Sequence, residues 1–265
     1  MESAIQGAIG MQLMPVAVIQ TNSLPGQALQ FKEGAFGCVA ALLKSASKGK
    51  TAVFTRKTFG CPGGGVGLGF GNCYENFPGG IEHFLSTGNS GFCQTEFGKA
   101  VASRMPDLEE GERYFKTPET AGSFIASLPI TDIPEEYVVF KPLEDVDENE
   151  TPKVVVFLVN PDQLSALVIL ANYARKCSEN VIVPFAAACH TIGIIPFREA
   201  ESETPRAVIG LTDITVRNKF AKDLLSFAIP YTMFVEMESN VDGSFLEKHN
   251  WQNLLERNKT AQAIP

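Results

Sequence analysis

Short apolar runs alternate with helical patterns along the chain, and together they predict a sheet with helices packed on it. An apolar run at residues 16–19 predicts a first strand, and a helix over residues 38–47 leads to a second strand over residues 51–56. Residues 153–159 form a continuous run rich in β-branched side chains, which is typical of a strand covered on both faces. The alternation indicates an α/β or α+β protein with a mixed sheet and flanking helices.

Capping residues mark two of the helix starts. Thr117 followed by Pro118 predicts a helix that ends before Pro129, and Asn160 followed by Pro161 opens another. The other expected elements are short helices over 80–86 and 95–103, strands over 181–185, 206–211 and 231–237, and helices over 219–227 and 243–257.

The two halves of the chain are weakly similar. In each half a helix leads to a strand and then to a cysteine, Cys61 in the first half and Cys189 in the second. Ligand crevices in open α/β sheets form beyond the carboxyl ends of strands, so this pattern suggests that both cysteines face one site. Chance is the alternative, since a helix followed by a strand is common.

Composition and charge narrow the class of protein. The chain has 265 residues, of which 45% are hydrophobic, so it can bury a sizeable core without disulfides. Its net charge of −8 repels phosphate backbones and anionic lipids, which argues against nucleic acid or a membrane as a partner. A secretory signal begins with a positively charged region, but no Lys or Arg precedes Lys32 in this sequence. We therefore expect a cytoplasmic protein. We predict a single compact domain over residues 1–265, with a soft boundary between two lobes at the acidic segment 143–152.

The most unusual segment is residues 60–73, where seven of fourteen residues are glycine. This content predicts a loop, and neither a P-loop nor a Gly-x-Gly-x-x-Gly fingerprint is present. Backbone N–H groups of Gly63, Gly64 and Gly65 could form an anion-binding nest, or the glycines could let the chain pass close to a cofactor. The alternative is a tight structural loop.

The cysteines are the candidate metal ligands. No Cys-x-x-Cys pair occurs, so a zinc ribbon is not expected. Four thiolates that the fold would bring together could instead hold an iron–sulfur cluster, and these are Cys38, Cys61, Cys73 and Cys189. The alternative is that they are buried as small hydrophobic residues.

Cys61 is also the best candidate nucleophile, because a nearby cation such as Arg56 lowers the pKa of a thiol. His190 is the candidate base, although a lone histidine among apolar residues is more often a hydrogen-bonded core residue. Arg56 or Arg217 could hold an acidic ligand. The default for Arg217 is an ion pair with Asp213, one helical turn before it.

Three motifs resemble one known family. They are Gly60-Cys61-Pro62-Gly63-Gly64 followed by Gly67-Leu68-Gly69, the segment Tyr137-Val138-Val139-Phe140-Lys141-Pro142-Leu143, and the segment Val159-Asn160-Pro161-Asp162-Gln163-Leu164. Together they resemble the family catalogued as domain of unknown function 169, over most of the chain. The resemblance implies an archaeal or anaerobic bacterial cytosol, in which reduced thiols or a cluster survive, and it implies no established reaction.

Two functional hypotheses follow from these residues. The first is a redox or ligand-binding protein whose cysteines and Gly-rich segment hold an iron–sulfur cluster. The second is a cofactor-free protein that either binds a small anionic molecule or is a thiol enzyme using Cys61. Both expect a small-molecule ligand or cofactor as the partner, and the sequence leaves open whether the protein is an enzyme.

Overall fold

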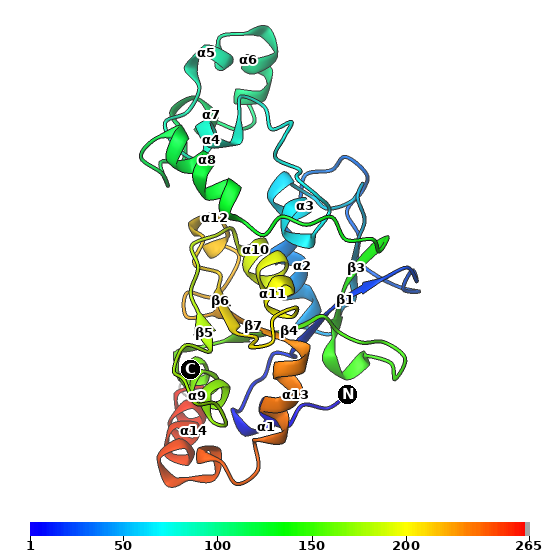
Figure 1. The fold of residues 1–265 in the computed structure, drawn as a ribbon, viewed down its shortest axis with the longest axis vertical. Helices are drawn as coiled ribbons and strands as arrows, with labels where there is room; N and C mark the ends of the chain where they lie inside the picture. Colours follow the sequence, from blue (N-terminus) through cyan, green and yellow to red (C-terminus); the bar gives the residue numbers. More distant parts are fainter. Residues whose placement is uncertain (263–265) are drawn as a thin grey trace.

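A seven-stranded mixed sheet forms the body of the protein in the computed structural model, which describes residues 1–262 (Figure 1). The strands are β1 (Val16–Thr21), β2 (Ala52–Phe54), β3 (Tyr137–Pro142), β4 (Val154–Val159), β5 (Val181–Ile182), β6 (Ala207–Gly210) and β7 (Leu225–Pro230). Their order is β2-β3-β1-β4-β7-β6-β5, and β5 with β6 is the parallel pair among antiparallel neighbours. The mixed sheet with flanking helices that the sequence predicts is confirmed. The last residues of the predicted domain, 263–265, lie outside the described part of the chain.

Strand β4 lies at the centre of the sheet, and all its residues are buried. Successive side chains of a strand point to opposite faces. Val154 and Val156 accordingly join one core cluster, whereas Val155 and Phe157 join the other. The prediction of a strand covered on both faces is confirmed.

Helices cover both faces of this sheet. On the face of Val154, the core includes residues of α2 (Val39–Ala46), α3 (Pro62–Leu68), α10 (Ala188–Ile192) and α11 (Ile194–Glu199). On the opposite face, it includes residues of α1 (Ala4–Ala8), α9 (Pro161–Asn172), α13 (Tyr231–Ser239) and α14 (His249–Gln262). Three short helices, η1 (Leu143–Asp145), α12 (Ile214–Arg217) and η2 (Phe245–Glu247), lie in the connections. No helix of the described chain is long and apolar enough to cross a lipid bilayer.

A helical lobe, residues 71–131, stands at one end of the sheet body (Figure 1, top). It contains α4 (Ile81–Phe84), α5 (Ser90–Cys93), α6 (Glu96–Ala102), α7 (Asp107–Glu110) and α8 (Pro118–Ser127). The chain leaves and re-enters the body side by side, at an antiparallel bridge between Phe70 and Asp132. The Gly71 N–H donates to the carbonyl of Thr131 at 3.0 Å, so the chain connects the lobe to the body through two short neighbouring segments.

The acidic segment 143–152 does not lie at the base of the helical lobe. It connects β3 to β4, and both of these strands pair with β1. This segment is therefore a connection within one sheet, and the division visible in the fold lies at the base of the helical lobe.

The two predicted helix caps are confirmed. The side chain of Thr117 accepts a hydrogen bond from the backbone N–H of Thr120 at the start of α8. Asn160 and Gln163 form a reciprocal capping box at the start of α9, with bonds of 3.0 and 3.1 Å.

The predicted loop in the Gly-rich segment is wrong over Pro62–Leu68, which forms helix α3. Local signals for this helix are present: Cys61 is its N-cap, Pro62 occupies its first turn, and Gly69 ends it with a φ of 85°. A single glycine costs a helix up to about 1 kcal/mol, so a contact elsewhere must justify so many of them.

One such contact is the crossing of α3 with α10. A Cβ atom on Gly67 would lie 2.6 Å from the backbone carbonyl of Cys189. A Cβ atom on Gly193 would lie 1.8 Å from the carbonyl oxygen of Gly67. The two helices touch backbone to backbone, and glycine is the residue that permits this approach.

Two predicted elements near the C-terminus are also wrong. Residues 219–227, predicted as a helix, lead into strand β7, and residues 231–237, predicted as a strand, lie in helix α13. Along β7, Phe227 and Ala228 face opposite cores, as in a strand. Along α13, Met233 and Met237 face one core at helical spacing. Both segments are short and rich in apolar residues, a case in which burial in the fold decides the secondary structure.

The helix crossing predicts the effect of alanine at two glycines. Gly67→Ala is expected to lower the free energy of unfolding by about 1–3 kcal/mol, because backbone atoms of Cys189 cannot move out of the way. Gly122→Ala in α8 is the control: its new Cβ would meet nothing within 4 Å, and we expect stabilisation of about 0.5–1 kcal/mol. Urea unfolding measures both. A Gly67→Ala variant as stable as the parent would contradict the backbone contact.

Candidate functional site

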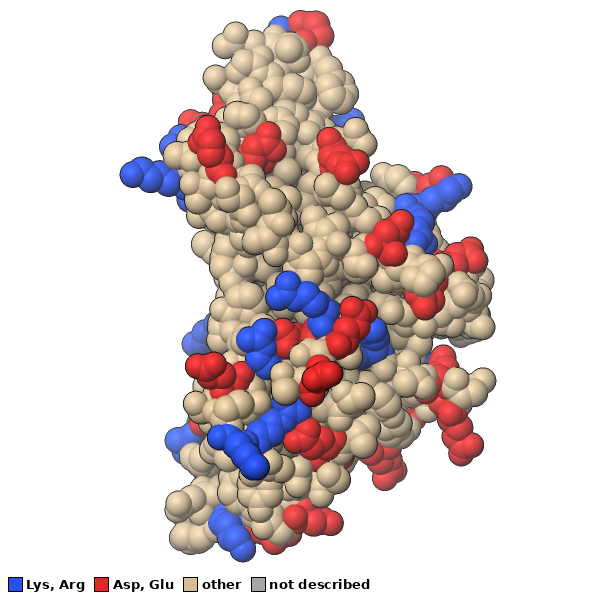
Figure 2. Space-filling view, viewed as in Figure 1, with Lys and Arg blue, Asp and Glu red and all other residues tan. Residues whose placement is uncertain are grey.

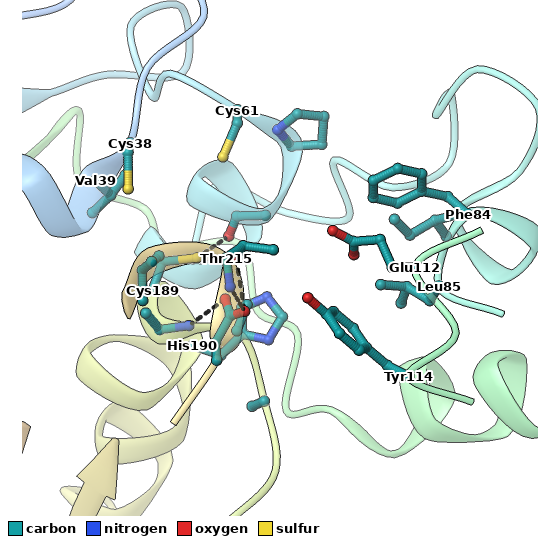
Figure 3. A pocket seen from close by; sticks show the side chains of 18 of the residues that line it. Cys38, Val39, Cys61, Phe84, Leu85, Glu112, Tyr114, Cys189, His190 and Thr215 are labelled. Atoms are coloured by element: carbon teal, nitrogen blue, oxygen red, sulfur yellow. Dashed lines mark hydrogen bonds between the residues drawn. The ribbon is translucent and has the colours of Figure 1, made fainter. Parts of the chain in front are cut away.

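A cavity of about 500 Å³ lies between the sheet body and the helical lobe. Its body wall includes Cys38, Cys61, Gly63, Tyr74, Cys189, His190 and Asp213, and its lobe wall includes Phe77, Phe84, Leu85, Glu112, Tyr114, Phe115 and Phe124. Figure 3 shows the two walls facing each other, with the labelled cysteines and His190 opposite Phe84, Glu112 and Tyr114. Tyr74 belongs to the lobe by sequence, but its hydroxyl forms a hydrogen bond with His190 of the body wall.

The crossing of α3 and α10 places the thiols. Cys61 caps α3, where its Sγ accepts the N–H of Gly64 at 3.3 Å, and Cys189 lies in α10 and donates its S–H to the carbonyl of Gly63 at 2.8 Å. Cys38, the N-cap residue of α2, lines the same wall. The structure therefore brings three of the four predicted metal ligands to one cavity.

Burial governs the ionisation of these thiols. Loss of solvent has the largest effect and raises the pKa of Cys61. The N–H groups of Gly64 and Gly63 lower it in part, and the nearby Cys38 and Asp213 raise it. Burial raises the pKa of Cys189 well above its ordinary value. Both groups are therefore neutral thiols at pH 7.

His190 carries an unused hydrogen-bonding atom. The residue is 1% exposed, its Nε2 lies 3.0 Å from the Tyr74 hydroxyl, and burial lowers its pKa to about 4, so the ring is neutral. Its Nδ1 is buried and has no hydrogen-bond partner. If Tyr74 donates to Nε2, the hydroxyl proton finds an acceptor and Nδ1 carries the ring proton. We assign this tautomer because the reverse one would leave the buried hydroxyl proton unpaired as well.

Two carboxylates line the cavity. Asp213 caps α12, accepting hydrogen bonds from the N–H and hydroxyl of Thr215, and it also accepts from the N–H of Ala188 at 3.4 Å. Burial, followed by the charge of Asp213, raises the pKa of Glu112 to about 7. Lys219 is the one Lys or Arg among the lining residues that the structure describes.

Backbone strain is found beside both acids. Among residues 1–262, the non-glycine residues with positive φ are Arg113 (60°) and Leu211 (62°). Arg113 separates Glu112 from Tyr114, and Leu211 precedes Asp213 by two positions. Such strained residues tend to gather at functional sites.

Cys73 lies apart from the cavity. Its thiol is 3.5 Å from the carbonyl of Phe70, and burial raises its pKa. Within the described residues, no three His, Cys, Asp or Glu side chains are grouped so that they could hold a metal ion. In this arrangement the four predicted thiols do not fit a four-cysteine cluster, and the iron–sulfur cluster stays a prediction from the sequence.

The two predicted anion-binding arginines lie outside the cavity. Arg56 pairs with Asp132 at 2.8 Å and donates to the carbonyls of Ile133 and Glu135 at the base of the lobe. Arg217 does not bond to Asp213 but donates to backbone carbonyls, among them Leu224 at 2.6 Å. Its guanidinium group stabilises the turn that follows α12.

The N–H groups of the predicted glycine nest are bonded within helix α3. The N–H groups of Gly64 and Gly65 donate to the Sγ and the carbonyl oxygen of Cys61, and Gly63 is the one of the three glycines that lines the cavity. The three glycines therefore do not present a row of free donors to a ligand.

Three residues of the cavity, Tyr74, Glu112 and Tyr114, were not predicted from the sequence. Glu112 and Tyr114 flank the strained residue Arg113 on a segment with no regular structure, and Tyr74 follows Cys73 in a turn. The segment Glu112-Arg113-Tyr114-Phe115, in which two charged residues precede two aromatic ones, is the one local signal.

Comparisons with known proteins give one match. The model of the family domain of unknown function 169, described as an uncharacterised ArCR, matches residues 4–240. No curated protein and no solved structure matches the chain.

Thiol alkylation tests the ionisation of the cavity cysteines. At about pH 7.5 we expect iodoacetamide to modify the exposed Cys177 about tenfold faster than Cys61 or Cys189, because thiolates react and the two cavity thiols have raised pKa values. Peptide mass spectrometry over a time course gives the rate at each cysteine. Modification of Cys61 as fast as that of Cys177 would instead support an activated nucleophile.

Proposed function

The chain belongs to the family domain of unknown function 169, and we propose that it is a binding protein for a small molecule with a largely apolar body. The occupied site would be the cavity between the sheet body and the helical lobe. The single observation that carries this proposal is that His190, a residue of this mainly apolar cavity wall, has a buried Nδ1 without a hydrogen-bond partner.

The cavity walls suit an apolar ligand. Rings of the lobe wall pack against one another and against Phe185, with centroids 4.9 Å apart for Phe115 and Phe124 and 5.5 Å apart for Phe124 and Phe185. A volume of about 500 Å³ is typical of sites that enclose a small organic molecule. Such sites combine apolar walls with a few polar groups that orient the ligand.

His190 supplies the orienting group. A buried N–H without a partner costs about 1–3 kcal/mol, and a ligand oxygen that accepts this bond would recover the loss. Because burial keeps the imidazole neutral, the ring acts as a hydrogen-bond donor and carries no charge. The neighbouring thiols of Cys61 and Cys189 are neutral as well, so they offer polarisable contacts rather than a resting nucleophile.

The cluster prediction has its own test, which the binding proposal does not require. Anaerobic purification from iron-replete cells, followed by an absorption spectrum and assays for iron and sulfide, would reveal an iron–sulfur cluster. A colourless, iron-free protein would contradict that prediction and leave the apolar cavity as the site.

Filling the cavity should abolish binding of an apolar dye. We expect the neutral fluorophore Nile red to bind the unaltered protein, and Ala187→Leu, which adds a side chain to the half-buried wall of the cavity, to weaken binding about tenfold or more. Ala100→Leu, on the exposed face of α6, is the matched control and should bind as the parent does. Equal binding by all three proteins would show that the dye sits elsewhere and would contradict the proposal.

The role of His190 can be separated from general apolar binding. Benzylacetone and butylbenzene share an apolar skeleton, but the ketone adds an acceptor oxygen. We expect His190→Phe to weaken displacement of Nile red by the ketone, relative to the hydrocarbon, about fivefold, the value of one hydrogen bond. An unchanged ratio in a folded variant, checked by circular dichroism, would exclude His190 as the orienting donor.

A further inference from the structure

We propose that the ligand is an amphipathic amine, whose ammonium group lies against Glu112 on the lobe wall while its apolar body fills the cavity. This inference rests on the proposed function and adds the charge of the ligand to it. It is carried by the carboxyl groups of the cavity, by the aromatic rings around Glu112, and by the unpartnered nitrogen of His190 on the opposite wall.

The two carboxylates of the cavity have no cationic partner. Among the described residues, neither Glu112 nor Asp213 takes part in an ion pair, although ten pairs are formed elsewhere in the protein. Figure 2 shows that charged side chains are frequent over the sheet body, whereas a largely uncharged band separates it from the lobe on this face. A carboxylate that faces an apolar cavity without a counter-ion is stabilised by a cation that the ligand brings.

The N-termini of the nearby helices do not change the preference of the cavity for a cationic ligand. The positive ends of α10 and α12 already meet a carboxylate, because Asp213 accepts hydrogen bonds from the N–H groups of Ala188 and Thr215. The N–H of Gly64, in the first turn of α3, donates to Cys61. An anionic ligand would therefore approach two carboxylates, with Lys219 as the one cationic residue among the described lining residues.

Aromatic rings complete the subsite. In Figure 3 the carboxyl group of Glu112 lies between the rings of Phe84 and Tyr114 and points toward the wall of Cys61 and His190. Aromatic faces attract cations, and the attraction grows when the cation is desolvated. An ammonium group here would meet a carboxylate and ring faces together, whereas a neutral hydroxyl would gain one hydrogen bond.

His190 fixes the direction of the ligand. Its buried Nδ1 lies on the body wall and lacks an acceptor, while Glu112 on the lobe wall lacks a cationic donor. A ligand that satisfies both has an ammonium group at one end and an acceptor oxygen toward the other.

The subsite predicts a pH dependence, since the pKa of Glu112 is about 7. Binding of an ammonium group favours the charged carboxylate, so affinity should rise as pH increases through 7, while the amine itself stays protonated. The facing groups are Cys38, Cys61, Cys189, His190, Tyr74, Tyr114, Asp213 and Lys219, and the charge of Asp107 on α7 also raises the pKa of Glu112. The pKa of His190 is lowered to about 4, and the pKa of Tyr114 is raised to about 12. The pKa values of Cys61, Cys189 and Tyr74 are also raised. Glu112 therefore changes charge near neutrality, whereas these five groups do not.

Three matched probes test the inference: phenylbutylamine, phenylbutanol and phenylbutanoate, each used to displace Nile red from the full chain. At about pH 8.5 we expect the amine to act at about tenfold lower concentration than the alcohol, with the carboxylate weakest. At about pH 5.5 the advantage of the amine should fall below about threefold, because Glu112 is then protonated.

Glu112→Gln should abolish both the advantage of the amine and its pH dependence, without weakening displacement by the alcohol. Glu110→Gln, an exposed acid of α7 that does not line the cavity, is the matched control and should behave as the parent. If Glu112→Gln fails to fold, the pH series on the unaltered protein still tests the inference: an amine advantage that does not change between about pH 5.5 and 8.5 would overturn it.

The outcomes separate the two proposals. If the alcohol or the carboxylate displaces the dye as well as the amine does, the charge inference is overturned and the apolar binding site stands. If the dye binds and none of the three probes displaces it, or the dye does not bind at all, the proposed function itself is contradicted, and the inference falls with it.

Discussion

The whole arrangement depends on how closely helices α3 and α10 approach each other. At Gly67 and Gly193 the two backbones are in contact, with no room for a side chain between them. This approach holds the N-cap of α3 beside α10, and so it places Cys61, Cys189 and His190 on one wall. With a larger residue at the crossing, the helices would separate. Cys61, Cys189 and His190 would still be present, but they would no longer lie on one wall.

The crossing also explains why the thiols and the imidazole of this wall are neutral. Helices packed this tightly over a sheet exclude water, and exclusion of water raises the pKa values of thiols and lowers that of an imidazole. The carboxyl groups of the cavity belong instead to Asp213, at the start of α12, and to Glu112, on the lobe. The body wall thus offers shape, polarisable atoms, one N–H donor and the carboxylate of Asp213, and the lobe adds the titratable carboxyl group of Glu112.

Local signals in the sequence were sufficient where structure is decided locally. The β-branched run that became β4 and the caps at Thr117 and Asn160 were predicted, because a strand buried on both faces and a capped helix leave their pattern in adjacent residues. Helix α3 was missed, since the contact that requires Gly67 is with the backbone of Cys189, more than a hundred positions away. Cys61 and Cys189 could be linked through the similarity of the two halves, whereas Glu112 has no counterpart in the other half and could not.

The base of the helical lobe has a consequence for how such a protein can diversify. The lobe is joined to the body through two neighbouring segments, at the bridge between Phe70 and Asp132, and Arg56 stabilises this base from the body side. An inserted unit that begins and ends at one place can change its length or sequence while the sheet and the helix crossing stay as they are. The lobe wall of the cavity is therefore encoded in one continuous stretch of chain, separable from the stretches that form the sheet and the helix crossing.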